Sequence, residues 1–224
     1  MISRALLTVF VLVMAGSAAR AADAQQNAPD GWSCKSPREE VRPDFAYLPN
    51  GGPKGNGSFV IEAGGRQGDI GWWEKTFAVQ GGQSYRFTTL RKATRVEVPR
   101  RTAVARVVWR DANDRPVVHD APTSGSYRRG DLPPAQPEFP ADGVTDEAGW
   151  TAVSGVYRAP PKAARAIVEL YYRWEAGGRV EWAEVAFEPS EPLPARTVRL
   201  ATVHLRPREG KTSAEKCRQF APLI

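Results

Sequence analysis

Two pairs of adjacent aromatic residues are the features of the sequence best suited to contact a ligand. Trp72 and Trp73 form the first pair, and Tyr171 and Tyr172 form the second. Aromatic faces stack on the apolar face of pyranose rings, and nearby polar groups complete the recognition. Because neighbouring residues of a β-strand point to opposite faces of the sheet, we expect one member of each pair to face outward. The alternative interpretation is that these aromatics only fill the core.

No residues of the chain form a recognisable catalytic set. His119 and His204 are isolated, and each is interpreted as a hydrogen-bonded structural histidine. The sequence contains no Gly-x-Ser-x-Gly, His-Glu-x-x-His or phosphate-loop motif. Cys34 and Cys217 are the two cysteines, which excludes a disulfide-dense scaffold. They could pair in an oxidising compartment, but they lie far apart in the sequence. The sequence therefore leaves two alternatives, a Cys34–Cys217 disulfide and two free thiols.

The first 21 residues have the form of a secretory signal peptide. Met1–Arg4 is a short positive start, Ala5–Gly16 is apolar except for Thr8, and Ala19-Arg20-Ala21 fits a cleavage site. The apolar run is shorter than the roughly 20 residues that a membrane-spanning helix needs. We therefore expect an exported chain, periplasmic, cell-surface or secreted, with no transmembrane anchor after cleavage.

The net charge of +6 on 224 residues does not indicate a nucleic-acid-binding protein. The basic excess lies at the two ends of the chain, while residues 22–195 carry nearly equal numbers of basic and acidic side chains. A nucleic-acid-binding domain concentrates its positive charge on the folded body. The local basic stretch Arg86–Arg115 is interpreted as the solvated face of alternating strands rather than as a phosphate-binding surface.

The elements that must position the aromatic pairs are short strands separated by Gly- and Pro-rich turns. In Ser84–Leu90, the residues Tyr85, Phe87 and Thr89 alternate with polar neighbours, which is the period of a half-buried strand. No segment before residue 190 has helical periodicity over three turns. The pattern predicts a mainly β chain, an antiparallel β-sandwich. Its expected strands are 58–62, 72–79, 84–90, 102–110, 150–157, 165–174 and 179–188, with 120–149 as a long loop.

The last 29 residues differ in kind from the body. Thr197–Leu205 is an apolar-rich strand, and Thr212-Ser213-Ala214-Glu215 matches a capping box, so a helix is expected from Ser213. One strand and one short helix cannot bury their own apolar faces, so this is an incomplete α/β fragment. The expected organisation is a signal peptide (1–21), an extended segment (22–56), the sandwich (57–188), a Pro-rich linker (189–195) and the α/β fragment (196–224).

The body resembles carbohydrate-binding-module and galactose-binding-like sandwiches of jelly-roll type. The segments that carry this resemblance are Gly71–Val79, Gly81–Phe87, Val107–Asp111, Gly149–Thr151 and Gly178–Val185. The resemblance implies glycan binding. It also implies a structural calcium, for which Glu62 and Glu184 are the candidates, although that family usually has paired Asp residues where this chain has Ala183-Glu184. No other cofactor is expected.

The C-terminal fragment resembles the first strand and first helix of carbon–nitrogen hydrolases, the nitrilase superfamily. Together with Ser36–Glu40, the combination resembles secreted bacterial members in which a sandwich precedes the hydrolase domain. That family uses a Glu base, a Lys and a Cys nucleophile. None of them can be assigned here, because Cys217 lies on the first helix and not at the nucleophile's place. We therefore expect no hydrolysis of amides or nitriles by this chain alone.

These observations lead to one hypothesis and two alternatives. The hypothesis is a non-catalytic accessory module of an exported carbon–nitrogen hydrolase, truncated at the start of the hydrolase domain. It would bind a glycan or cell-surface polymer, or pack against the missing hydrolase domain. The alternatives are a free-standing secreted carbohydrate-binding protein and a structural domain without a ligand. The sequence specifies neither the glycan nor the oligomeric state.

Overall fold

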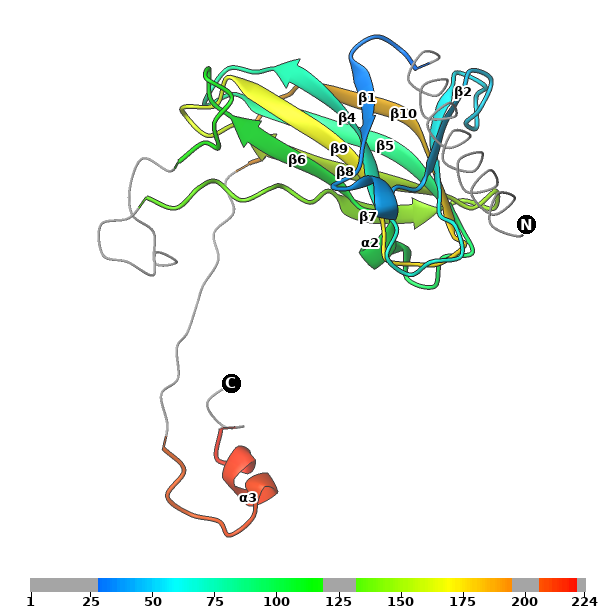
Figure 1. Ribbon diagram of the computed structural model, residues 1–224. Helices are drawn as coiled ribbons and strands as arrows, with labels where there is room; N and C mark the ends of the chain where they lie inside the picture. The colour runs from blue at the N-terminus through cyan, green and yellow to red at the C-terminus, as the bar shows by residue number, and fades with distance from the viewer. Residues whose placement is uncertain (1–27, 119–131, 195–205, 221–224) are drawn as a thin grey trace, which may run out of the picture. The chain divides into compact units, whose positions relative to one another are not determined.

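The computed structural model describes residues 28–118, 132–194 and 206–220 (Figure 1). The chain forms two compact units, Met1–Pro192 and Leu193–Ile224. The expected signal peptide and the whole of the expected strand Thr197–Leu205 lie outside the described residues, so both stay predictions. Within the described residues, no helix has the length and apolar character needed to cross a membrane.

Two antiparallel sheets make up the first unit, which confirms the predicted mainly β sandwich. The four-stranded sheet has the order β1-β4-β9-β6, and the six-stranded sheet has the order β2-β3-β10-β5-β8-β7 (Figure 1). The strands of the four-stranded sheet are β1 (Trp32–Lys35), β4 (Ile70–Ala78), β6 (Ala105–Arg110) and β9 (Arg165–Arg173). Those of the six-stranded sheet are β2 (Asp44–Leu48), β3 (Ser58–Glu62), β5 (Ser84–Thr94), β7 (Ala141–Thr145), β8 (Trp150–Arg158) and β10 (Arg179–Pro189). Two short helical segments, η1 (Glu39–Val41) and α2 (Pro99–Thr102), join strands.

Strand alternation builds the core between the two sheets. On β9, the residues Ala166, Val168, Leu170 and Tyr172 are all buried, and they belong to one continuous cluster of buried side chains. The largest fully buried side chains of this cluster are Trp73, Trp109 and Trp182. Burial of apolar area on this scale is the main favourable term in folding, and it fixes which residues of each strand remain outside.

The sandwich begins earlier than the sequence led us to expect. The segment 22–56 was expected to be extended, but it contributes β1 to the four-stranded sheet and β2 to the six-stranded sheet. Trp32 of β1 packs on Phe59, with ring centroids 4.4 Å apart, and Phe45 of β2 is buried as well. The two strands have four and five residues between turn residues, which is too short for a clear period.

The expected long loop 120–149 also contains a strand. β7 lies at the edge of the six-stranded sheet, where it pairs with β8 in a register that shifts between Asp142 and Thr145. Its side chains are mostly exposed, so its sequence lacks the alternation by which half-buried strands are recognised. Before it, Glu138 forms a bridge to Val107 of β6.

The described part of the second unit contains one helix, α3 (Ser213–Arg218). The predicted capping box is confirmed, since the Glu215 amide donates to the Thr212 hydroxyl over 3.2 Å and the Thr212 amide donates to the Glu215 carboxylate over 3.1 Å. No residue of α3 is buried, and Cys217 is exposed.

Candidate functional site

The antiparallel register of β4 and β9 brings the two aromatic pairs together. Trp72 lies opposite Tyr171, and their rings stack with centroids 4.8 Å apart and an interplanar angle of 17°. Trp73 and Tyr172 point the other way and are both 0% exposed. The expectation that one member of each pair faces outward is therefore confirmed, and the structure assigns Trp72 and Tyr171 to the outer face.

A basic side chain completes the stack on the far side of Tyr171. β9 lies between β4 and β6, and Arg106 of β6 has its guanidinium carbon 4.6 Å from the centre of the Tyr171 ring. The same guanidinium donates to the Tyr171 hydroxyl over 2.6 Å and forms an ion pair with Glu169. Tyr171 is thus held between Trp72 and Arg106 and keeps little exposed surface of its own.

A second ion pair borders the stack on the side of β1. The indole N–H of Trp72 donates to a Glu74 carboxylate oxygen over 2.8 Å, and Lys35 of β1 contacts the other oxygen at 2.6 Å. Six residues of the four-stranded sheet therefore form one outward surface, which we call the aromatic–polar face. Its members are Lys35, Trp72, Glu74, Arg106, Glu169 and Tyr171.

Burial adjusts the protonation of two groups on the aromatic–polar face. Burial raises the pKa of the Glu169 carboxyl, Arg106 lowers it, and the nearby Glu74 raises it again. Burial has the largest effect, so the pKa lies above the ordinary value of a glutamate. Burial and the nearby Glu169 also raise the pKa of the Tyr171 hydroxyl, so this phenol stays neutral. The face therefore offers fixed hydrogen-bonding groups beside an indole ring, which is suited to holding a polyhydroxyl ligand.

The two carboxylates expected to hold calcium are not brought together. Glu62, at the end of β3, contacts Arg95 at 3.0 Å and Arg179 at 3.5 Å. Glu184 lies in the irregular part of β10, between Ala183 and Ala186, where Lys54 contacts it at 2.8 Å. Since β3 pairs with β10 from Glu62 at one end to Ser58 opposite Ala183 at the other, the two sites are separated by the length of the strand. Among the residues that the structure describes, no three His, Cys, Asp or Glu side chains gather as a metal site.

The two cysteines are not bonded to one another in this structure. Cys34 lies on β1 in the first unit, and Cys217 lies on α3 in the second. Arg42 donates to the Cys34 sulfur over 3.2 Å, yet burial raises the pKa of this thiol more than Arg42 lowers it. The disulfide stays a prediction.

Two pockets that the sequence did not indicate are lined by described residues. One, of about 540 Å³, lies beside Glu184 and includes Tyr47 and Phe59. The other, of about 410 Å³, lies at one end of the sandwich and includes the exposed Trp174. Its residues come from three loops far apart in the sequence, so no local motif marks it. The only sequence signal was a tryptophan shortly before Gly177-Gly178 at the end of a predicted strand.

The comparisons with known proteins support the fold. No family model matches the sequence, and neither does any curated protein. The enzymatically active domain of bacteriophage CBA120 tailspike protein 4 is similar over 75% of this chain and 20% of that one, with a TM-score of 0.50 and 14% identity. This chain therefore spans about a fifth of that protein.

Carbohydrate-binding modules are among the other similar structures. A family 16 module matches over 74% of this chain and 95% of its own, with a TM-score of 0.46 and 12% identity. The xylan-binding CBM22-1 domain of Paenibacillus barcinonensis Xyn10C matches over 76% and 93%, with a TM-score of 0.45 and 11% identity. At such identities the likeness concerns the β-sandwich fold alone.

Proposed function

We propose that the sandwich is a non-catalytic module that binds a glycan through the aromatic–polar face. The observation that carries this proposal is the outward stack of Trp72 on Tyr171, bordered on each side by an ion pair. Carbohydrate binding is also what the sequence resemblance of the body implies.

The contacts within the aromatic–polar face indicate a different role in ligand binding for each of its residues. Tyr171 lies between Trp72 and Arg106, so its ring serves as a support rather than as the stacking surface. Trp72 keeps part of its indole exposed, and its N–H is fixed by Glu74, so the ring is held in one orientation before a ligand arrives. Preorganised groups lose less conformational entropy on binding. Lys35, Glu74 and Arg106 supply charged donors and acceptors for sugar hydroxyls.

A glycan screen tests this proposal. The chain without residues 1–21 would be run by affinity electrophoresis through gels that contain xylan, mixed-linkage β-glucan, mannan, galactan, pectin or soluble peptidoglycan fragments. We expect at least one polymer to retard the wild type, and Trp72→Ala to abolish most of that retardation. Val144→Ala is the control, since Val144 is exposed on β7 of the other sheet. Equal retardation of Trp72→Ala and the wild type would exclude the aromatic–polar face.

We further propose that the chain is exported and serves a carbon–nitrogen hydrolase. Export is supported by the signal-peptide pattern of residues 1–21, and the hydrolase by the resemblance of residues 196–224. An antibody raised against the sandwich would be used on fractionated native cells, with mass spectrometry of the captured polypeptides. We expect a mature N-terminus near Ala22 outside the cytoplasm and a hydrolase with Glu, Lys and Cys catalytic residues in the same or an associated chain. Capture without any hydrolase would favour a free-standing carbohydrate-binding protein.

A further inference from the structure

The pocket at the end of the sandwich is formed by three loops that join different strands. Gln67 comes from the loop between β3 and β4, Glu97–Thr102 from the segment between β5 and β6, and Trp174–Ala176 from the turn between β9 and β10. We call it the loop-end pocket. Its volume of about 410 Å³ lies within the range of roughly 300–1,000 Å³ in which proteins hold small molecules.

Trp174 presents its indole at this pocket from a strained backbone. The side chain is 52% exposed, and its φ of 67° lies in the left-handed region that non-glycine residues rarely adopt. Such a conformation is unfavourable for a non-glycine residue and persists only where surrounding contacts impose it. Those contacts are present: the Trp174 amide donates to the Asp69 carbonyl over 2.9 Å, and Arg173 lies over the indole at 4.3 Å.

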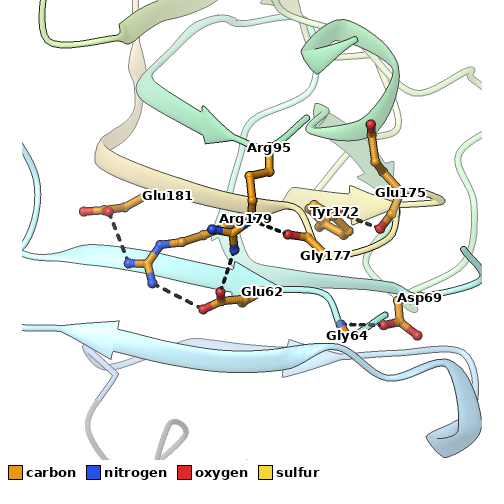
Figure 2. A network of polar contacts seen from close by, with 9 residues as sticks. All are labelled: Glu62, Gly64, Asp69, Arg95, Tyr172, Glu175, Gly177, Arg179 and Glu181. Atoms are coloured by element: carbon orange, nitrogen blue, oxygen red, sulfur yellow. Dashed lines mark hydrogen bonds and ion pairs between the residues drawn. The ribbon is translucent and has the colours of Figure 1, made fainter. Parts of the chain in front are cut away.

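A network of polar contacts joins the loops from which the pocket is built (Figure 2). The Arg95 side chain donates to the Gly177 carbonyl over 2.7 Å and to Glu62 over 3.0 Å, as Figure 2 shows. Gly177 in turn donates its amide to the Gly64 carbonyl over 2.6 Å. These hydrogen bonds therefore connect the three loops that line the pocket to one another.

Glu175 ties the remaining loop to the pocket. One of its carboxylate oxygens accepts from the Glu97 amide over 2.9 Å and the other from the Thr102 hydroxyl over 3.1 Å. Its carbonyl accepts from the Tyr172 hydroxyl over 2.7 Å (Figure 2). Both carboxylate oxygens already have a partner, so Glu175 shapes the pocket rather than offering its charge to a ligand.

Three exposed polar side chains of the pocket remain available for a ligand. Within the part of the chain that the structure describes, the side chains of Gln67, Glu97 and Arg101 form no hydrogen bond or ion pair with protein groups. They provide an amide, a carboxylate acceptor and a guanidinium donor next to an aromatic ring. Vicinal hydroxyl groups, which both donate and accept, match such a mixture of groups.

We infer that the loop-end pocket is a second binding site, one that takes a single neutral sugar unit stacked on Trp174. The exposed charges of Glu97 and Arg101 have opposite signs, so they give the pocket no net preference for an anion or a cation. An uncharged ring with an apolar face and a hydroxyl edge matches both the indole and these two polar groups. This inference goes beyond the proposed function, and either can fail without the other.

The aromatic–polar face and the loop-end pocket lie next to each other along one strand. Tyr171 and Arg173 are two residues apart on the outward side of β9, and Arg173 reaches both the Trp174 ring and the Arg101 carbonyl, the latter over 3.0 Å. A pocket at the end of an extended surface is suited to the terminal unit of a chain rather than to an internal one.

A titration followed by nuclear magnetic resonance tests this site directly. The ¹⁵N-labelled chain would be titrated with glucose, xylose, galactose, mannose and arabinose, and with inorganic phosphate and glucuronate as anionic probes. The reporters are the Trp174 indole N–H and the Gln67 side-chain amide. We expect at least one neutral sugar to shift both signals. The site is refuted if none of the five neutral sugars shifts them, and its neutral class is refuted if either anion binds more tightly.

Variants separate this site from the aromatic–polar face. Trp174→Gly removes the ring and suits the left-handed backbone, so the fold is retained. It should weaken sugar binding about tenfold or more, as read from the Gln67 amide. Arg101→Ala keeps Trp174 as a reporter and should also weaken binding severalfold, whereas Trp72→Ala should leave this titration unchanged. Unchanged affinity in both Trp174→Gly and Arg101→Ala would place the sugar elsewhere.

Discussion

Glu74 and Glu169 occupy directly opposed positions on β4 and β9, two residues along from the stacked pair of Trp72 and Tyr171. Like charges in such positions destabilise a sheet. Here each carboxylate has its own cation, Lys35 for Glu74 and Arg106 for Glu169, contributed by the strands on either side. Arg106, Glu169 and Glu74 therefore lie in one row across the sheet. Lys35 reaches Glu74 from the position opposite Trp72, so the four charges border the aromatic stack.

The stability of the sandwich should depend on the charge of Glu169. Burial raises the pKa of Glu169, so the folded chain holds this proton at a higher pH than the unfolded chain does. The free energy of unfolding therefore falls as the pH rises from the ordinary glutamate value through the raised one. Glu169→Gln lacks this titration, so its stability relative to the wild type should improve over the same interval. Urea unfolding at a series of pH values measures this, and a relative loss of stability would contradict the assignment.

Trp72 and Trp73 should respond very differently to truncation. Trp73 is fully buried, and its indole N–H donates to the Val60 carbonyl over 3.1 Å, so Trp73→Ala should cost about 3–5 kcal/mol of stability. Trp72→Ala removes a partly exposed ring from the outer face and should cost roughly 1 kcal/mol. Thermal unfolding of the two variants gives the comparison, and similar losses would show that the faces are assigned wrongly.

The outward direction of Trp72 and Tyr171 could be predicted because alternation along a strand is a local property. The stacking of these two residues could not, since it depends on the register between β4 and β9, which are distant in the sequence. The loop-end pocket could not be predicted for the same reason, since its residues Gln67, Arg101 and Trp174 are distant in the sequence and meet only in the folded chain. The short strands β1 and β2 could not be predicted from the sequence, because four or five residues between turns show no clear hydrophobic period.

The two cysteines should differ in reactivity in the reduced protein. Burial raises the pKa of the Cys34 thiol, and its partial burial restricts access, while Cys217 is exposed. Since the thiolate is the reactive form, a disulfide reagent at mildly alkaline pH should modify Cys217 first and Cys34 fully only after unfolding. Mass spectrometry of peptides from a time course separates the two sites. Faster modification of Cys34 would refute this prediction.

Removing the second unit should leave the sandwich equally stable. Among residues 206–220 none is buried, and within the described ranges the last member of the buried cluster is Phe187. A chain that ends at Pro192 should therefore unfold within about 2 °C of the longer chain, a shift that corresponds to less than 1 kcal/mol for a domain of this size. Differential scanning calorimetry gives both midpoints, and a fall of several degrees would show that the tail supports the sandwich.

The affinity of Trp72→Ala for the glycan that the wild type binds best tests the central claim most directly. Isothermal titration calorimetry would compare the variant with the wild type and with Val144→Ala. Loss of one stacking ring should cost about 1–2 kcal/mol, a roughly five- to thirtyfold weakening, with the unfolding transition retained. Unchanged affinity in Trp72→Ala, or a wild type that binds no glycan at millimolar concentration, would contradict the account.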